Sequence, residues 1–128
     1  LMVDTLTNAF ITTLLEAKPD VPVFLVEGQA YAHEPYDTKQ QVKMPETNKT
    51  LHKKFLEFKA KGVKNIYYID RQNLIGPDGE GTVDGAHLTD LGFVFYAQKL
   101  RPYLKAALEH QPIPFQNGIE QLYDTITK

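Results

Sequence analysis

Two short apolar runs, separated by a long amphipathic segment, most constrain the fold of this chain. Residues 21–26 (Val-Pro-Val-Phe-Leu-Val) and 65–69 (Asn-Ile-Tyr-Tyr-Ile) are rich in β-branched and aromatic side chains, as is typical of strands buried in a parallel sheet. Between them, residues 48–61 have apolar side chains at helical spacing, while their lysines and His52 are expected to stay solvated. Gly62 is the expected helix stop. This strand–helix–strand order predicts an α/β fold with a parallel sheet.

Helical patterns flank both predicted strands. Residues 9–17 have apolar side chains at helical spacing and stop before Pro19, which disfavours helix at the preceding residue. A longer apolar helix is expected over residues 89–108, with Thr89 as its cap and Pro102 inside it. The polar stretch at residues 27–45 is expected to be an irregular loop.

The first residues of the chain have the composition of a strand end. Leu1 to Val3 are apolar and lead into Asp4–Asn8, which we interpret as a passage from strand to loop. The sheet would then have about three strands, which is few for a parallel sheet covered on both faces. The predicted fold is therefore incomplete on its N-terminal side.

Length and charge limit the function further. The chain has 128 residues, enough for one domain with a real core, and residues 110–128 are expected to form a C-terminal tail. The net charge of −2 offers no basic surface for nucleic acid, and no apolar stretch reaches the ~20 residues that cross a bilayer. Cysteine is absent, which excludes disulfides and thiolate metal sites but leaves the compartment open.

Asp84 and His87 form the most informative pair in the sequence. They are three residues apart, in a glycine-containing loop directly before the last predicted helix. An aspartate that holds one ring nitrogen of a histidine leaves the other nitrogen to act as a general base. The sequence contains neither serine nor cysteine, so two members of a hydrolase triad stand without an ordinary nucleophile. Thr82 is a weak substitute, because threonine nucleophiles generally need specialised activation.

Functional loops of an α/β sheet gather at the carboxyl ends of its strands. If the strands are parallel, Asn8, the Tyr31/His33 region and the Asp84–His87 pair share one cleft, in which Asn8 is a candidate oxyanion donor. Simpler interpretations stay open: Asp84 could satisfy backbone amides of its turn, and Asn8 could cap a helix. A metal site with His87 and His33 also stays open, although the sequence has no ligand set of fixed spacing.

Four segments of the sequence resemble one known family. GTVDGAHLTDLGFVFYAQKL at residues 81–100 resembles the last conserved block of the SGNH (GDSL-like) hydrolases, where the catalytic Asp and His lie in a D-x-x-H loop. VDTLTN at residues 3–8 looks like the block whose Asn lines the oxyanion hole, with Thr5 and Thr7 where this branch typically has Cys and Pro. VPVFLVEGQAY at residues 21–31 and GVKNIYYIDRQNLIGPDGEGTVDG at residues 62–85 fit the branch related to bacterial carbohydrate esterases and acylhydrolases.

The resemblance implies a partial flavodoxin-like, SGNH-type three-layer α/β/α sandwich over residues 1–109, with a parallel sheet and the N-terminal strands missing. It makes Asp84 the acid that orients the histidine, His87 the general base and Asn8 one oxyanion donor. The serine of the family belongs to a block that would precede Leu1 and has no counterpart in this sequence. No metal or organic cofactor is implied.

The expected function is that of the C-terminal part of a serine esterase or acylhydrolase. Its substrate would be a small-molecule or carbohydrate carboxylic ester, such as an acetyl ester, and the chain alone would be inactive because it lacks the serine. Tyr31, His33 and Tyr36 are candidate substrate-wall residues, because tyrosine packs against sugar faces and offers a hydroxyl. Two alternatives are a non-catalytic carbohydrate- or protein-binding module, and a truncated product that forms a homo-oligomer through an exposed sheet edge.

Overall fold

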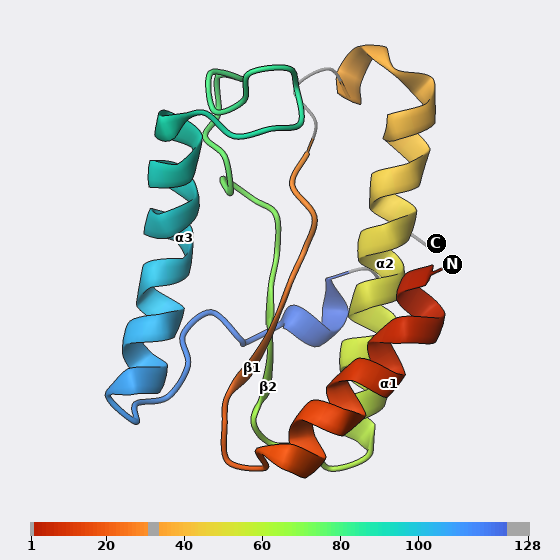
Figure 1. The fold of residues 1–128 in the computed structure, drawn as a ribbon, viewed down its shortest axis with the longest axis vertical. Helices are drawn as coiled ribbons and strands as arrows, with labels where there is room; N and C mark the ends of the chain where they lie inside the picture. Colours follow the sequence, from red (N-terminus) through yellow and green to blue (C-terminus); the bar gives the residue numbers. More distant parts are fainter. Residues whose placement is uncertain (1, 31–33, 123–128) are drawn as a thin grey trace. The chain divides into compact units, whose positions relative to one another are not determined.

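A computed structural model describes residues 2–30 and 34–122 of the chain (Figure 1). Its helices and strands follow one another as α1 (Met2–Ala17), β1 (Val23–Val26), η1 (Glu34–Tyr36), α2 (Thr38–Ala60), β2 (Ile66–Ile69), α3 (Asp90–Leu108) and η2 (Ile119–Gln121), the two η elements being 3-10 helices. They divide into two compact units. The first unit comprises Leu1–Glu27, Glu46–Ile69 and Phe115–Lys128, and the second comprises Gly28–Pro45 and Asp70–Pro114.

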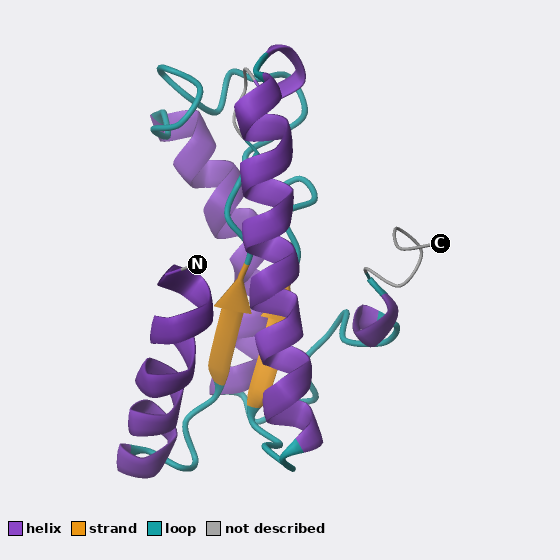
Figure 2. Cartoon of the chain, turned by 90° about the vertical axis from the view of Figure 1, so that its right-hand side faces the viewer, coloured by secondary structure: helices purple, strands orange, loops and turns teal. Residues whose placement is uncertain are grey.

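The two strands form a parallel pair, as the sequence predicts. β1 and β2 lie side by side (Figure 2), in a register that places Val23 opposite Ile66 and Val26 opposite Ile69. The connection between them runs through α2, which makes a β–α–β unit. The described part of the chain thus has a mixed helix–strand structure with a two-stranded parallel sheet, which confirms the predicted fold class.

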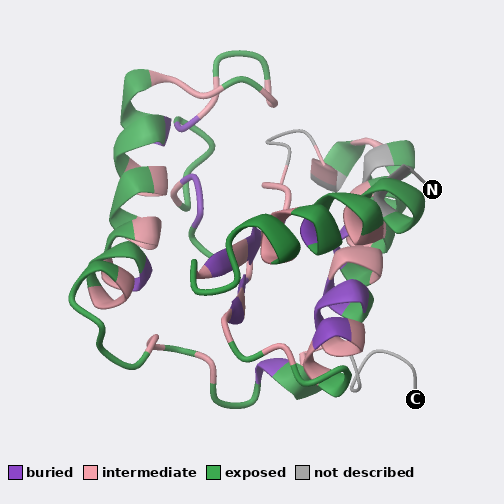
Figure 3. Ribbon diagram, turned by 60° about the horizontal axis from the view of Figure 1, so that its bottom comes forward, coloured by how far each residue is buried: buried purple, intermediate pink, exposed green. Residues whose placement is uncertain are grey.

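The core of the first unit is built from both strands, α1, α2 and the C-terminal segment. Figure 3 shows buried residues on the strands and on α2. The buried apolar side chains of this core are Ile11, Val23, Leu25, Phe55, Phe58, Ile66, Tyr68 and Ile119. The apolar face that helical spacing predicted for residues 48–61 is therefore the face that packs inward.

The expected strand end at Leu1 to Val3 is wrong, as is the expected loop at Asp4–Asn8. Helix α1 already begins at Met2 and continues to Ala17 without interruption, while Leu1 lies outside the described residues. No glycine or proline occurs between its ends, and Ile11, which is 2% exposed, anchors it to the core. Among the described residues the sheet therefore has two strands instead of three.

Helix α2 begins ten residues before its predicted start at Asn48, inside the expected loop. Its first turn is capped by Asp37, whose Oδ1 accepts the backbone N–H of Lys39 at 2.9 Å. Pro45 lies within the helix, where it removes one backbone hydrogen bond. The boundary between the two units falls directly after this proline.

Two polar residues of α2 that were expected to be solvated are buried. His52 is 3% exposed, and its Nε2 atom lies 2.6 Å from the carbonyl oxygen of Ile119. Lys54 is 6% exposed, with its Nζ atom 2.8 Å from Oδ1 of Asp4 and 3.0 Å from Oε2 of Glu57. These residues are covered by α1 and the C-terminal segment, which periodicity within α2 alone could not reveal.

The segment expected to be a tail adds two contacts to the first unit. The side-chain amide of Gln116 donates to the carbonyl oxygen of Tyr68 at 2.9 Å and accepts its backbone N–H at 3.1 Å. Three residues later, Ile119 begins η2 and is 7% exposed in the core. Gln116 thereby occupies a backbone position of β2 that a neighbouring strand would otherwise pair.

In the second unit, α3 is capped as the sequence predicts. The hydroxyl of Thr89 accepts the backbone N–H of Gly92 at 3.0 Å and donates to the carbonyl oxygen of Glu80 at 2.9 Å. Further along the helix, Lys99 forms an ion pair with Asp70 at 2.9 Å. No helix in the described part of the chain has the length and apolar content needed to span a membrane.

Candidate active site

The loop that leads into α3 is a closed turn held by its own backbone. Thr82 and Leu88 form an antiparallel bridge, and the N–H of Val83 donates to the carbonyl oxygen of His87 at 2.8 Å. Gly81 is required at the base of the turn, because a Cβ atom there would lie 2.1 Å from the carbonyl oxygen of Ile75. The loop is therefore a defined structure on which side chains can be oriented.

Asp84 and His87 contact each other within this loop. The Nδ1 atom of His87 lies 2.6 Å from Oδ2 of Asp84. The other carboxylate oxygen, Oδ1, accepts the backbone N–H groups of Ala86 at 3.0 Å and of His87 at 2.8 Å. Gly85, with a φ of 87°, supplies the left-handed conformation that this tight turn needs. Asp84 thus makes both the backbone contacts and the imidazole contact that the sequence left as alternatives.

Electrostatics keep this aspartate ionised. The hydrogen bonds from the backbone N–H of His87, from its ring and from the backbone N–H of Ala86 hold the pKa of Asp84 well below its usual range. A carboxylate accepts hydrogen bonds only, so Nδ1 of His87 is the protonated ring nitrogen in the neutral imidazole. Nε2 then carries the lone pair, and the ring of His87 is 84% exposed. The pair can take up a proton at Nε2.

A side chain from another segment contacts the same loop. The side-chain amide of Gln29 donates through Nε2 to the carbonyl oxygen of Ala86, the residue directly before His87. Gln29 follows β1 along the chain, so it lies in one of the loops where functional residues are expected. Glutamine at this position belongs to no catalytic pattern in the sequence, so sequence reasoning missed it.

The structure describes two of the other predicted site residues, Asn8 and Tyr36. Asn8 lies in α1 of the first unit, and its Oδ1 atom is buried without a hydrogen-bond partner among the described residues. Tyr36 ends η1 with 90% of its surface exposed. Tyr31 and His33 lie outside the described residues.

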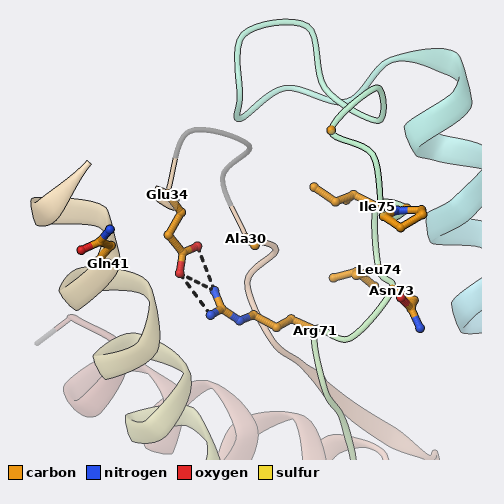
Figure 4. Close-up of a pocket in the computed structure, with 10 residues that line it drawn as sticks. Ala30, Glu34, Gln41, Arg71, Asn73, Leu74 and Ile75 are labelled. Carbon is orange, nitrogen blue, oxygen red and sulfur yellow. Dashed lines mark hydrogen bonds and ion pairs between the residues drawn. The ribbon is translucent and has the colours of Figure 1, made fainter. Parts of the chain in front are cut away.

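The second unit also contains a cavity of about 440 Å³ that the sequence analysis did not predict. Glu34 and Arg71 line it and form a forked ion pair, with Nη1 of Arg71 3.0 Å from Oε2 of Glu34 and both guanidinium nitrogens 3.1 Å from Oε1 (Figure 4). The buried residues Leu74 and Ile75 line the same cavity. No three His, Asp or Glu side chains come close enough to hold a metal ion in the part of the chain that the structure describes.

Comparison with known proteins assigns the family. The model of the GDSL-like lipase/acylhydrolase family matches residues 2–105, which is most of the chain. The chain belongs to this family of hydrolases. As a GDSL-like chain, it carries the D-x-x-H pair in the loop before its last long helix, as the sequence resemblance implied.

A solved structure supports the same assignment. A protein named as a GDSL-like lipase, from Bacteroides ovatus ATCC 8483, superposes on the GDSL-like chain with a TM-score of 0.75 and 30% sequence identity. The match covers 80% of this chain and 31% of the Bacteroides chain, so this chain spans about a third of the length of that relative. A search of curated proteins gave no match.

Proposed function

We propose that this chain is the histidine-bearing part of an ester hydrolase, in which Asp84 and His87 are the acid and base of a Ser-His-Asp mechanism. The observation that carries the proposal is the 2.6 Å contact between Oδ2 of Asp84 and Nδ1 of His87. That contact fixes the tautomer in which the exposed Nε2 atom is the basic nitrogen. Membership of a lipase/acylhydrolase family supports the choice of ester hydrolysis.

The proposed reaction follows acyl transfer in two steps. Nε2 of His87 takes the proton of a serine hydroxyl as its oxygen attacks the ester carbonyl carbon, and the imidazolium then protonates the departing alcohol. Water attacks the acyl-enzyme in the second step, again with His87 as base, which releases the carboxylic acid and restores the serine. Asp84 stabilises the imidazolium in both steps.

We propose that the nucleophile is a serine outside these 128 residues, which include none. We assign Asn8 as a donor to the oxyanion, since its amide Nδ2–H₂ group is the kind of donor that stabilises such an intermediate. Acetyl esters of carbohydrates are the proposed substrates, with Tyr31, His33 and Tyr36 as candidate contacts to the sugar.

Hydrolysis of p-nitrophenyl acetate tests this proposal. We compare this chain with a longer one that also carries the preceding coding sequence, each with and without His87→Ala. Only the longer chain should be active, and His87→Ala should lower its kcat/KM by about 10³-fold or more. His110→Ala is the matched control, because His110 is an exposed histidine of the same unit.

Two outcomes would contradict the proposal. Activity in the serine-free chain that depends on His87 would show that the missing nucleophile is not a serine outside the chain. Absence of activity in the longer chain would favour a binding module instead.

A further inference from the structure

The charged side chains of Glu34 and Arg71, which line the same cavity, neutralise each other. Among the described residues, these two are the only charged ones that line it, and their opposite charges compensate each other through three hydrogen bonds. The side chains are largely enclosed, with 12% of Glu34 and 28% of Arg71 exposed. An anion entering the cavity would have to displace Glu34 from the guanidinium, and a cation would have to displace Arg71 from the carboxylate.

The walls of the cavity combine hydrogen-bonding groups with an apolar surface. Leu74 and Ile75 are 1% and 8% exposed, and Figure 4 shows their side chains pointing to the side on which the ion pair lies. Gly76 and Gly79 also line the cavity, beside Gln41, Asn73 and Pro77, and no backbone carbonyl of the described residues accepts a hydrogen bond from the N–H of either glycine. A ring with several hydroxyl groups would match this lining. Its hydroxyls can donate to Glu34 and accept from Arg71, and the apolar face of the ring can pack on Leu74 and Ile75.

Two consecutive residues, Gln29 and Ala30, connect the proposed catalytic loop to this cavity. Ala30 lines the cavity, and the residue before it, Gln29, donates to the carbonyl oxygen of Ala86 beside His87. A volume of about 440 Å³ falls within the range of small-molecule sites.

We propose that the Glu34–Arg71 cavity binds the neutral sugar unit of the substrate, with the ion pair and the two glycine amides as its hydrogen-bonding groups. This inference rests on the proposed ester hydrolysis for its purpose, but it predicts binding that can be measured without any turnover. It also gives the ion pair a role in selectivity: the compensated charges reject sugars with a carboxylate or an ammonium group.

Three sugars with the same ring test the proposal, namely glucose, glucuronate and glucosamine. Each is titrated into the full ¹⁵N-labelled chain, and the amide resonances of Gly76 and Gly79 are followed by NMR. Glucose should shift both resonances saturably, while the two charged sugars should bind at least about tenfold more weakly. Glu34→Gln exposes the Arg71 charge and should invert this order, so that glucuronate binds at least tenfold better than glucose.

Glu109→Gln is the matched control, because Glu109 belongs to an exposed ion pair with Lys105 outside the cavity. It should leave all three titrations unchanged. Absence of shifts with glucose, or equal binding of all three sugars, would overturn the inference. If the spectrum of Glu34→Gln shows an unfolded chain, the order of the three sugars in the unaltered protein still decides.

The hydrolysis assay and the sugar titration can refute the proposed function and the proposed sugar site independently of each other. Hydrolysis that depends on His87, combined with no sugar binding at Gly76 and Gly79, would refute only the sugar site. Saturable glucose binding that persists in His87→Ala, combined with no hydrolysis in the longer chain, would refute only the proposed function.

Discussion

The carboxylate of Asp84 uses its two oxygens for different contacts with His87. Oδ2 lies 2.6 Å from the ring Nδ1 atom, while Oδ1 accepts the backbone N–H of the same residue at 2.8 Å. The backbone contact fixes where the histidine stands in the loop, and the ring contact fixes how its imidazole is turned. A substitution that keeps the acceptor at Oδ1 but changes Oδ2 should therefore alter the tautomer of the ring while it keeps the position of His87 in the loop.

Asp84→Asn should reverse the tautomer of His87. The amide oxygen would keep the backbone N–H bonds, which places the amide Nδ2–H₂ group where Oδ2 now lies. Nδ1 must then accept, so the proton moves to Nε2, which no longer acts as a base. We expect kcat/KM of the longer chain to fall by about 10³–10⁴-fold.

The tautomer itself can be read from the ¹⁵N chemical shifts of the His87 ring in the 128-residue chain. Asp78→Asn is a matched control, because Asp78 makes a similar turn through the N–H of Glu80 at 3.1 Å and has no part in the His87 contact. An Asp84→Asn variant with full activity would contradict the proposed role.

The same carboxylate should make stability depend on pH. Because hydrogen bonds lower the pKa of Asp84 in the folded chain, its stabilising effect is fully present above its unfolded pKa of about 3.9 and is lost as the pH falls through the lower folded value. Urea unfolding should show a difference in unfolding free energy between the unaltered chain and Asp84→Asn that is smaller at pH 3 than at pH 5. A difference that grows towards pH 3 would contradict this sign.

Gly81→Ala should disrupt the catalytic loop. The added Cβ would approach the carbonyl oxygen of Ile75 to 2.1 Å, and backbone cannot move away as a side chain can, so the turn must shift. Hydrolysis by the longer chain should be lost. Gly62→Ala is the comparison, because Gly62 has a φ of 86° and no atom within 4 Å of the new Cβ; it should cost about 1–2 kcal/mol of stability with hydrolysis unchanged.

Gln116→Ala should weaken the first unit. The substitution removes two hydrogen bonds from the backbone of Tyr68, which should cost about 1–3 kcal/mol of unfolding free energy. Hydrogen exchange at the Tyr68 amide should become faster. Gln121→Ala, at an exposed position of η2, should stay within about 0.5 kcal/mol, and equal effects of the two substitutions would argue against the edge contact.

Local sequence patterns predicted the elements that are determined by residues close together in the sequence. The strands at Val23–Val26 and Ile66–Ile69 follow from β-branched and aromatic runs, and the start of α3 follows from the capping chemistry of Thr89. The Asp84–His87 contact also follows from spacing within one turn. In each of these cases the residues that decide the structure lie close together in the sequence.

Long-range contacts explain what the sequence did not predict. The burial of His52 depends on Ile119, which lies 67 residues away, and the Glu34–Arg71 pair joins residues 37 apart. At the N-terminus, three apolar residues fit a strand end and a helical turn equally well. The segment is helical because it is continuous with the helix that Ile11 anchors in the core.

The contact of Gln116 with Tyr68 determines which edge of the small sheet can pair with a further strand. One edge of β2 is paired with β1, and at Tyr68 the opposite edge is already bound by a side-chain amide. Any additional strand, from a longer chain or from a second molecule, would therefore be steered to the far side of β1. A single glutamine side chain thus blocks the pairing of a further strand with β2 at Tyr68.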